Sequence, residues 1–198
     1  MRRRLSAKIY SMERKQKIKI PVYIAPSAYL NFSLLCLLMP IQWVAAFVFS
    51  TMIHEVCHLI ALRLCRVHVL SAGIQNFGMR INTAPISLRR EMICAMAGPA
   101  GSAALLLLAK WMPLTALCGL FHLLYNLLPI YPADGGRILR CGLKLFAGEQ
   151  TAEKIGRVIQ GAVLCLIGIS GIYVSLRWQL GLLPLVAVAL VLYRAKDK

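Results

Sequence analysis

Long apolar segments alternate with short polar segments along this chain, and the pattern predicts about six membrane-spanning helices. A spanning helix needs about 20 mostly apolar residues. The segments that meet or approach this length are Val22–Met39, Ile41–Leu64, Glu91–Ala109, Leu114–Ile130, Val158–Leu176 and Leu180–Tyr193. Pro40 separates the first two, because proline breaks a helix or begins the next one.

Two polar regions interrupt this pattern. Residues 66–89 mix polar and apolar side chains, and the stretches Val67–Leu70 and Met79–Ile81 are typical of short strands joined by a turn region. Residues 131–157 form a polar segment in which Arg137, Arg140 and Lys144 recur at helical spacing, which favours an amphipathic helix at the membrane surface. The predicted fold class is therefore an all-α polytopic membrane protein with a short β-hairpin between its second and third spans.

The distribution of Lys and Arg predicts the orientation. With a cytoplasmic N-terminus and six spans, 21 of the 23 Lys and Arg residues lie on the cytoplasmic side. They fall in residues 1–19, 63–90 and 131–157 and in the C-terminal tail. Only Lys110 and Arg177 lie on the opposite side. Because cytoplasmic loops carry an excess of positive charge, both termini are predicted to be cytoplasmic.

Composition supports the membrane class and argues against nucleic acid as a partner. The chain is 59% hydrophobic with a mean hydropathy of +0.69, and only 15% of its residues are charged, against about 25% in soluble domains. The net charge of +16 comes from basic blocks between apolar segments, as membrane topology requires. No signal peptide is expected, because the basic N-terminus is not followed by a cleavage site. The seven cysteines are interpreted as small packing residues.

The second predicted span carries an ionisable cluster, His54-Glu55-Val56-Cys57-His58. Two imidazoles at positions i and i+4 lie on one helix face and can bind one metal ion, and the glutamate can take a proton from a bound water. Ionisable groups within a membrane are costly and mark functional sites. The alternative is a chance match in which helix packing satisfies both histidines.

Asp134 is the best candidate for a third ligand, which a catalytic zinc usually requires. It follows the fourth predicted span on the cytoplasmic side, where charge counting also places the two histidines. Prolines at 129 and 132 prevent a regular helix before it. The alternative is a carboxylate in an interfacial turn or a helix N-cap, since Asp-Gly is a common turn pair.

The HExxH motif together with the string NLLPIYPADGG at residues 126–136 resembles the site-2 protease family of intramembrane zinc metalloproteases, peptidase family M50. The string is most similar to the sporulation branch, which processes an inactive sigma-factor precursor. The resemblance implies one zinc ion held by His54, His58 and Asp134, with Glu55 as general base. It further implies that Asn126 helps to hold substrate, and that the 66–89 hairpin is membrane-associated and lies near the substrate entrance.

The resemblance also sets the domain boundaries. Residues 1–21 are predicted to be a basic cytoplasmic segment, and residues 22–198 a single membrane-embedded metalloprotease domain with a catalytic core at about 41–137. Cys57 stands where the family often has Gly, and Ala133 stands where Leu is frequent. The regulatory domain that follows the last span in sporulation-type relatives is not expected here.

Two further residues are left with alternatives. Cys57 could approach the zinc, but it points about 100° around the helix from each neighbour, which favours packing. His122 lies one turn before Asn126 and is either a polar packing residue, the favoured interpretation, or an alternative ligand.

The predicted activity is hydrolysis of peptide bonds in membrane-associated or single-span proteins near the cytoplasmic side of the cell membrane. The predicted partners are a membrane protein substrate and the lipid bilayer, and an inhibitory or regulatory membrane partner is compatible with the arrangement. The sequence leaves the oligomeric state open. The alternative is a non-catalytic membrane zinc-binding or adaptor protein, which the intact Glu55 disfavours. A metal transporter is disfavoured because no chain of intramembrane acids is present.

Overall fold

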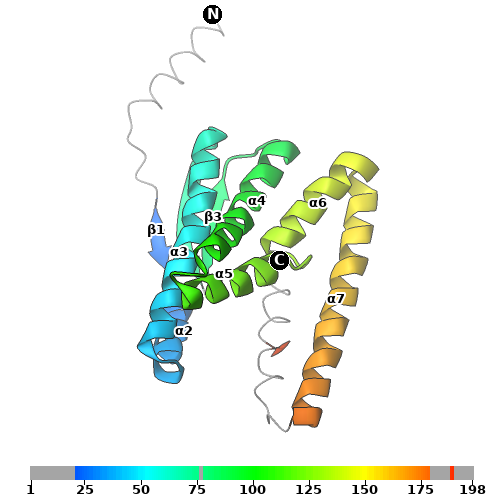
Figure 1. Ribbon diagram of the computed structural model, residues 1–198. Coiled ribbons are helices and arrows are strands. Elements are labelled where there is room, and N and C mark those ends of the chain that lie inside the picture. The colour runs from blue at the N-terminus through cyan, green and yellow to red at the C-terminus, as the bar shows by residue number, and fades with distance from the viewer. Residues whose placement is uncertain (1–20, 76–77, 179–187, 190–198) are drawn as a thin grey trace, which may run out of the picture.

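The computed structural model describes residues 21–75, 78–178 and 188–189 (Figure 1). Its elements in chain order are β1 (Val22–Ile24), α2 (Pro26–Leu38), α3 (Ile41–Leu64), β2 (Val69–Gln75), β3 (Gly78–Thr83), α4 (Leu88–Ala104), a 3-10 turn η1 (Leu105–Leu108), α5 (Pro113–Asn126), α6 (Asp134–Ala147) and α7 (Glu149–Trp178). The predicted class, a helical membrane protein with a small β-hairpin after the second predicted span, is confirmed.

Three helical segments within the described residues are long and apolar enough to cross a bilayer: Ile41–Leu64, Leu88–Leu108 and Glu149–Arg177. Large apolar side chains on their surfaces are exposed, including Leu64 of α3 and Leu176 of α7. Exposed apolar surface of this extent is unfavourable in water and favourable in lipid. These helices make the chain a membrane protein.

Two predicted spans are shorter helices in the structure. The first was predicted to begin at Val22, which is wrong, because residues 22–24 form strand β1 and α2 has only 13 residues. The fourth corresponds to α5, whose 14 residues end at Asn126 instead of continuing to Ile130. Pro129 explains this end, because a residue before proline is disfavoured in helical conformation. The sixth predicted span, Leu180–Tyr193, lies almost wholly outside the described residues.

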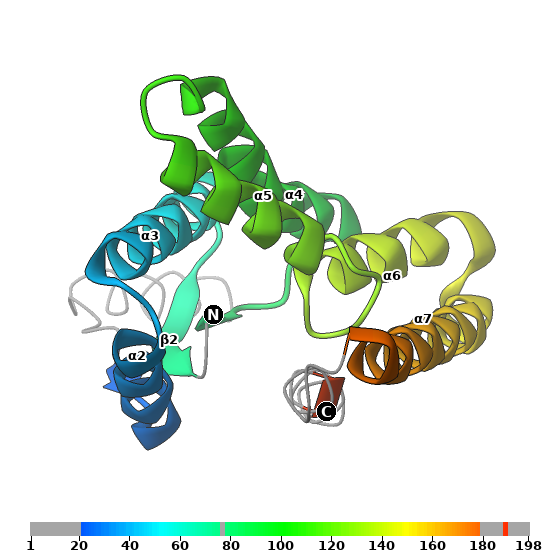
Figure 2. The same ribbon diagram turned by 60° about the horizontal axis from the view of Figure 1, so that its bottom comes forward.

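The segment 131–157 is mostly helical. It contains all of α6, which has the amphipathic pattern predicted around Arg140, and the first two turns of α7. Gly148 separates the two helices with a φ of 77°, a left-handed conformation that glycine adopts without strain. The two helices therefore form a helical hairpin, which both ribbon views show on one side of the molecule (Figures 1 and 2).

The predicted hairpin at residues 66–89 is confirmed, and a third strand joins it. Its first strand, predicted at Val67–Leu70, is longer and lies later in the chain, at Val69–Gln75. β2 pairs with β3 in antiparallel register, with Ile74 opposite Met79 and Ala72 opposite Ile81. β1 pairs in parallel with the other edge of β2, so the strand order is β1-β2-β3. β3 is consequently an edge strand. It also contacts α3, the helix that carries the HEVCH motif.

Helix α3, which carries the HEVCH motif, lies on one side of the central helix α4. It packs against α4 and α5, while α6 packs on the other side of α4 and α7 packs mainly against α6 (Figure 2). A small core cluster of Ala61, Leu62 and Cys94 joins the ends of α3 and α4 beside the sheet. The start of α6 therefore comes close to the middle of α3, although the two segments are 76 to 80 positions apart in sequence.

Candidate metal centre

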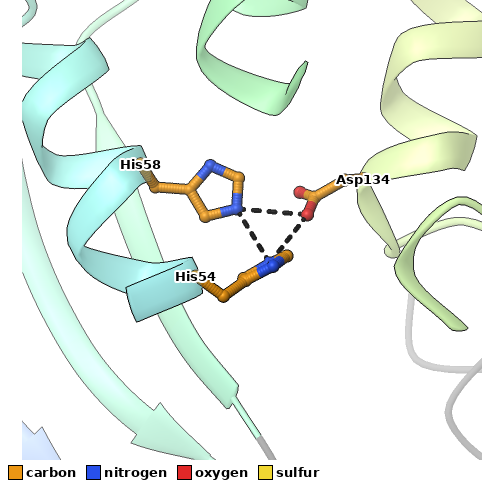
Figure 3. Close-up of side chains that lie close together, drawn as sticks. All are labelled: His54, His58 and Asp134. Carbon is orange, nitrogen blue, oxygen red and sulfur yellow. Dashed lines mark hydrogen bonds and ion pairs between the residues drawn. The ribbon is translucent and has the colours of Figure 1, made fainter. Parts of the chain in front are cut away.

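Three side chains from two distant segments converge in a buried position (Figure 3). His54 and His58 project from the same face of α3, one turn apart, and Asp134 projects from the first turn of α6. The Oδ2 atom of Asp134 lies 3.1 Å from the Nε2 atom of each histidine, and the two Nε2 atoms lie 3.2 Å apart. All three residues are at least 91% buried. The sequence prediction that these residues lie together is thus confirmed in space.

The spacing of these atoms fits a metal ion. Zinc binds histidine nitrogens and carboxylate oxygens at about 2.0–2.2 Å, and tetrahedral geometry then places neighbouring ligand atoms about 3.3 Å apart. The three observed separations of 3.1, 3.1 and 3.2 Å lie close to this value. Two imidazoles and one carboxylate also form a ligand set that suits zinc and leaves a fourth position open. The group could hold one metal ion.

Helix α4 fixes the orientation of both imidazole rings through their other nitrogens. His58 Nδ1 donates a hydrogen bond of 2.7 Å to the carbonyl oxygen of Cys94, and His54 Nδ1 lies 2.9 Å from Ser102 Oγ. A carbonyl can only accept, so the proton of neutral His58 resides on Nδ1 and Nε2 presents its lone pair. Such partners of the second ring nitrogen orient histidine ligands in metal sites.

Small residues on α4 allow this helix to lie close to the histidines of α3. A Cβ atom at Gly98 would lie 2.2 Å from His58 Nε2 and 2.7 Å from His54 Nε2. A Cβ atom at Gly101 would lie 2.4 Å from the Sγ atom of Cys57. A side chain at Gly98 would therefore displace a ligand ring or helix α4, whereas one at Gly101 would displace the end of the Cys57 side chain. The contact with Gly101 also shows that Cys57 packs between helices, as the favoured interpretation predicted.

Two glycines after Asp134 bring α6 against the preceding loop. A Cβ at Gly135 would lie 2.2 Å from the carbonyl oxygen of Leu127, and one at Gly136 would lie 2.6 Å from the backbone of Ile130. The Asp-Gly-Gly sequence thus seats the start of α6 beside α3. The alternative in which Asp134 is an interfacial turn carboxylate or an N-cap is wrong, because Ala133 is the N-cap and Asp134 is only 7% exposed.

The second oxygen of Asp134 faces a basic residue of its own helix. Its Oδ1 atom lies 3.9 Å from Arg137 Nη1, and the Arg137 side chain also lies 3.7 Å from Glu91 of α4. Burial raises the pKa of Asp134, but in the metal-free chain protonated His54 and His58 can donate hydrogen bonds to it, and these bonds and charges outweigh burial and lower the pKa to about 2. The carboxylate is therefore ionised at neutral pH.

Glu55, the predicted general base, lies between the two histidines in sequence and is half-buried. Its Oε1 atom accepts a hydrogen bond of 3.0 Å from the backbone N–H of Met79 in β3. It also lines a cavity of about 410 Å³ between α2, α3 and the hairpin, whose other walls are mostly apolar and include Phe32, Val48 and Met52. The structure thus links the HEVCH helix to the edge strand through this carboxylate.

Of the two candidate residues of α5, His122 lies beside the metal centre and Asn126 lies one turn further along the helix. The His122 ring is 5.6 Å from that of His54 and 5.1 Å from that of Phe47, and its Nε2 atom lies 3.2 Å from Thr51 Oγ1. These contacts favour the packing interpretation, and His122 is not in the converging group. Asn126 Nδ2 donates to the backbone oxygen of His122 at 3.0 Å. The role of Asn126 toward substrate stays a prediction.

Comparison with known proteins identifies the fold of the chain. No protein-family model matches the sequence, and no curated protein matches it either. A solved structure does match, the site-2 protease from Methanocaldococcus jannaschii, with a TM-score of 0.66 and 20% sequence identity over 92% of each chain. The chain has the fold of a site-2 protease. At this level of identity, the similarity establishes the fold alone.

Sequence analysis did not identify the residues of α4 that contact the two histidine ligands. Ser102 and the Cys94 carbonyl hold the outer nitrogens of the two histidines, and Gly98 leaves room for their inner nitrogens. Ala97 and Gly101 are small residues four positions apart, a spacing that predicts a close approach between helices but does not indicate which helix is approached. A backbone carbonyl has no sequence signal, so the Cys94 contact could not be found from the residues.

Proposed function

We propose that this chain is an intramembrane zinc metalloendopeptidase of the site-2 protease type. The observation that carries the proposal is the buried group of His54, His58 and Asp134, within a membrane protein of site-2 protease fold. Its ligand atoms are spaced for one zinc ion per chain. The outer histidine nitrogens are bonded so that the inner ones face this ion. Structural zinc sites usually have four protein ligands, whereas three with an open position are typical of catalysis.

Each side chain around the centre has its own proposed role in peptide hydrolysis. When bound, zinc polarises the scissile carbonyl and lowers the pKa of water to about 7. Glu55 is the residue proposed to take the proton of the attacking water and return it to the leaving amine. Asp134 and the two histidines would hold the ion, and Arg137 lies 3.9 Å from the far oxygen of Asp134. Burial of this group excludes bulk water and strengthens these electrostatic interactions.

The proposed substrate is a membrane-associated or single-span protein that presents an extended segment. A helical substrate conceals its peptide carbonyls in hydrogen bonds, so it must unwind before cleavage. The outer edge of β3 can replace the lost bonds by strand addition. β3 contacts the helix that carries Glu55, so an added strand would lie next to the metal centre. Asn126 is proposed to hold the substrate from the α5 side.

The proposed setting is the cell membrane, crossed several times, with both termini and the metal centre toward the cytoplasm. The uneven distribution of Lys and Arg supports this orientation. Lipid and a membrane protein substrate are the partners that the surface and the proposed chemistry require, and an inhibitory or regulatory membrane partner is compatible with them. Within the family, residues 126–136 favour the sporulation-type branch. No nucleic acid is expected to bind.

The experiment combines metal analysis with a cleavage assay. Purified protein in lipid vesicles should contain one zinc per chain and should cleave labelled casein, an unfolded polypeptide that serves as a general probe. The His54→Ala, His58→Ala double variant should lose both properties. Glu55→Gln should keep the zinc and lose cleavage. Zinc without cleavage in the wild type would favour the alternative, a non-catalytic zinc-binding or adaptor protein, and absence of zinc would refute the proposal.

A further inference from the structure

The hydrogen bond between Glu55 and Met79 joins the proposed base to the edge at which substrate is proposed to bind. The Met79 N–H donates to Glu55 Oε1 over 3.0 Å. Met79 lies in β3, whose inner edge pairs with β2. The Met79 N–H faces either toward β2 or away from it, and only an N–H that faces away belongs to the outer edge of the sheet. The pairing of β2 with β1 and β3 determines which of the two is the case.

Residues of a strand direct their backbone groups alternately to either side. The carbonyl of Ile74 in β2 accepts from the N–H of Ala25, just after β1, and the N–H of Ala72 donates to the carbonyl of Pro21, just before β1. Residues 72 and 74 therefore face the β1 side. Their partners in register, Ile81 and Met79, consequently face away from β2. The N–H of Met79 is thus an outward group of the edge strand.

An incoming strand needs this same N–H. Strand addition pairs the outward N–H and carbonyl groups of the edge with those of the added segment. Glu55 occupies the first of these donors with a carboxylate oxygen at 3.0 Å, which is an ordinary hydrogen-bond distance. The mostly apolar walls of the neighbouring cavity offer this carboxylate few other partners. Glu55 therefore stands where the carbonyl of a bound segment would stand.

We propose that the bond between Glu55 and the Met79 amide is a latch that substrate opens. The bond fixes the carboxylate at the strand edge while no segment is bound. An extended segment that pairs with β3 takes over the Met79 N–H and frees the carboxylate to serve the metal centre. The inference rests on the proposed function and adds its regulation: the base becomes available only to substrates long enough to pair as a strand.

The binding test needs no cleavage. The ligand is a peptide of about 12 residues whose centre is the position at which the protein cleaves casein. This peptide is longer than a typical strand of about 5–6 residues. Its Kd is measured on zinc-free protein by fluorescence anisotropy. If the latch must open on binding, Glu55→Ala should bind the peptide about tenfold more tightly than wild type. Glu55→Gln, which keeps a neutral acceptor, should be intermediate. Equal or weaker binding by Glu55→Ala would overturn the latch.

The kinetic test removes only the donor. Incorporating the α-hydroxy analogue of methionine at position 79 replaces the amide by an ester and retains the side chain. The same change at Ile81 is the matched control, because Ile81 also faces outward but its N–H does not donate to Glu55. Substrates are the peptide of about 12 residues and a shorter one of about four, which cannot form a strand of usual length.

The latch predicts a result specific to position 79. The ester at position 79 should increase kcat/KM for the short peptide on the order of tenfold. It should change kcat/KM for the long peptide only slightly. The ester at Ile81 should raise KM for the long peptide only. A decrease with both peptides at position 79 would mean that the amide positions Glu55 productively, and no change would mean that it has no role; either overturns the latch. A wild type that cleaves neither casein nor the peptides would refute the proposed function itself.

Discussion

Gly98 gives the sharpest test of the geometry at the metal centre. A Cβ atom at this position would lie 2.2 Å from His58 Nε2, 2.6 Å from its Cε1 and 2.7 Å from His54 Nε2. Real Cβ atoms essentially never approach within 3.0 Å, so Gly98→Ala must displace the His58 ring or helix α4 by roughly 0.8 Å. Metal–ligand distances tolerate only about 0.2 Å. Displacement of His58 also weakens its bond to the Cys94 carbonyl.

The expected loss follows from these distances. A misplacement of about 1 Å at a functional site costs about 10²-fold. We expect zinc affinity to fall by about this factor, equivalent to about 2.8 kcal/mol. The free energy of unfolding should change less, because the overpacking cost of about 1–3 kcal/mol is offset by about 1 kcal/mol from the helix preference of alanine.

The assay is competition for zinc against a chromophoric chelator, with thermal unfolding measured in parallel. Gly142→Ala on α6 is the matched control, since nothing lies within 4 Å of its Cβ position. Gly101→Ala is the second control, because its Cβ would meet Cys57 Sγ instead of a ligand atom. Both controls should keep zinc affinity within about threefold. Wild-type zinc affinity in Gly98→Ala would refute the packing of α4 against the two histidines.

The other predictions concern the base, the strand edge, the second ligand oxygen and the topology. Glu55→Gln should lower the casein cleavage rate by about 10²–10⁴-fold with zinc content unchanged; near-normal turnover would exclude Glu55 as the base. Ile81→Pro and Val69→Pro should reduce cleavage far more than the matching alanine variants, without zinc loss, and equal small effects would make the hairpin a mere connector. Arg137→Ala should weaken zinc binding by less than about tenfold in the chelator competition, because its side chain is 35% exposed and its contact with Asp134 is long. A cysteine at position 112 should be labelled from outside, and labelling only from the cytoplasm would reverse the topology.

The ligands could be predicted because their chemistry resides in side chains. Two histidines at helical spacing in an apolar segment, and one carboxylate in an irregular stretch on the same predicted side, indicate a shared site through residue type and spacing alone. The structure confirms that His54, His58 and Asp134 converge. The long apolar helices and the hairpin were predicted for a similar reason, since both depend on local periodicity and composition.

The parts that could not be predicted depend on contacts between distant backbones. β1 has only three residues, Val22–Ile24, which suit a strand but equally suit the start of an apolar span, and they form a strand because β2 offers them an edge. The Cys94 carbonyl and the Met79 N–H contact site residues through backbone groups, which carry no information about residue type. The sequence around Gly98 is typical of helix packing, and only the structure shows that this glycine faces the ligand atoms.

Cleavage of a single-span membrane protein in reconstituted vesicles tests the central claim most directly. Candidate substrates are incubated with zinc-loaded wild-type protein or with Glu55→Gln, and new amino termini are identified by mass spectrometry. The account predicts products whose new termini map to a membrane-embedded or juxtamembrane segment with the wild type, and none with Glu55→Gln. Products that form equally with both proteins, or a zinc-loaded wild type that yields none from any single-span protein or from casein, would contradict it.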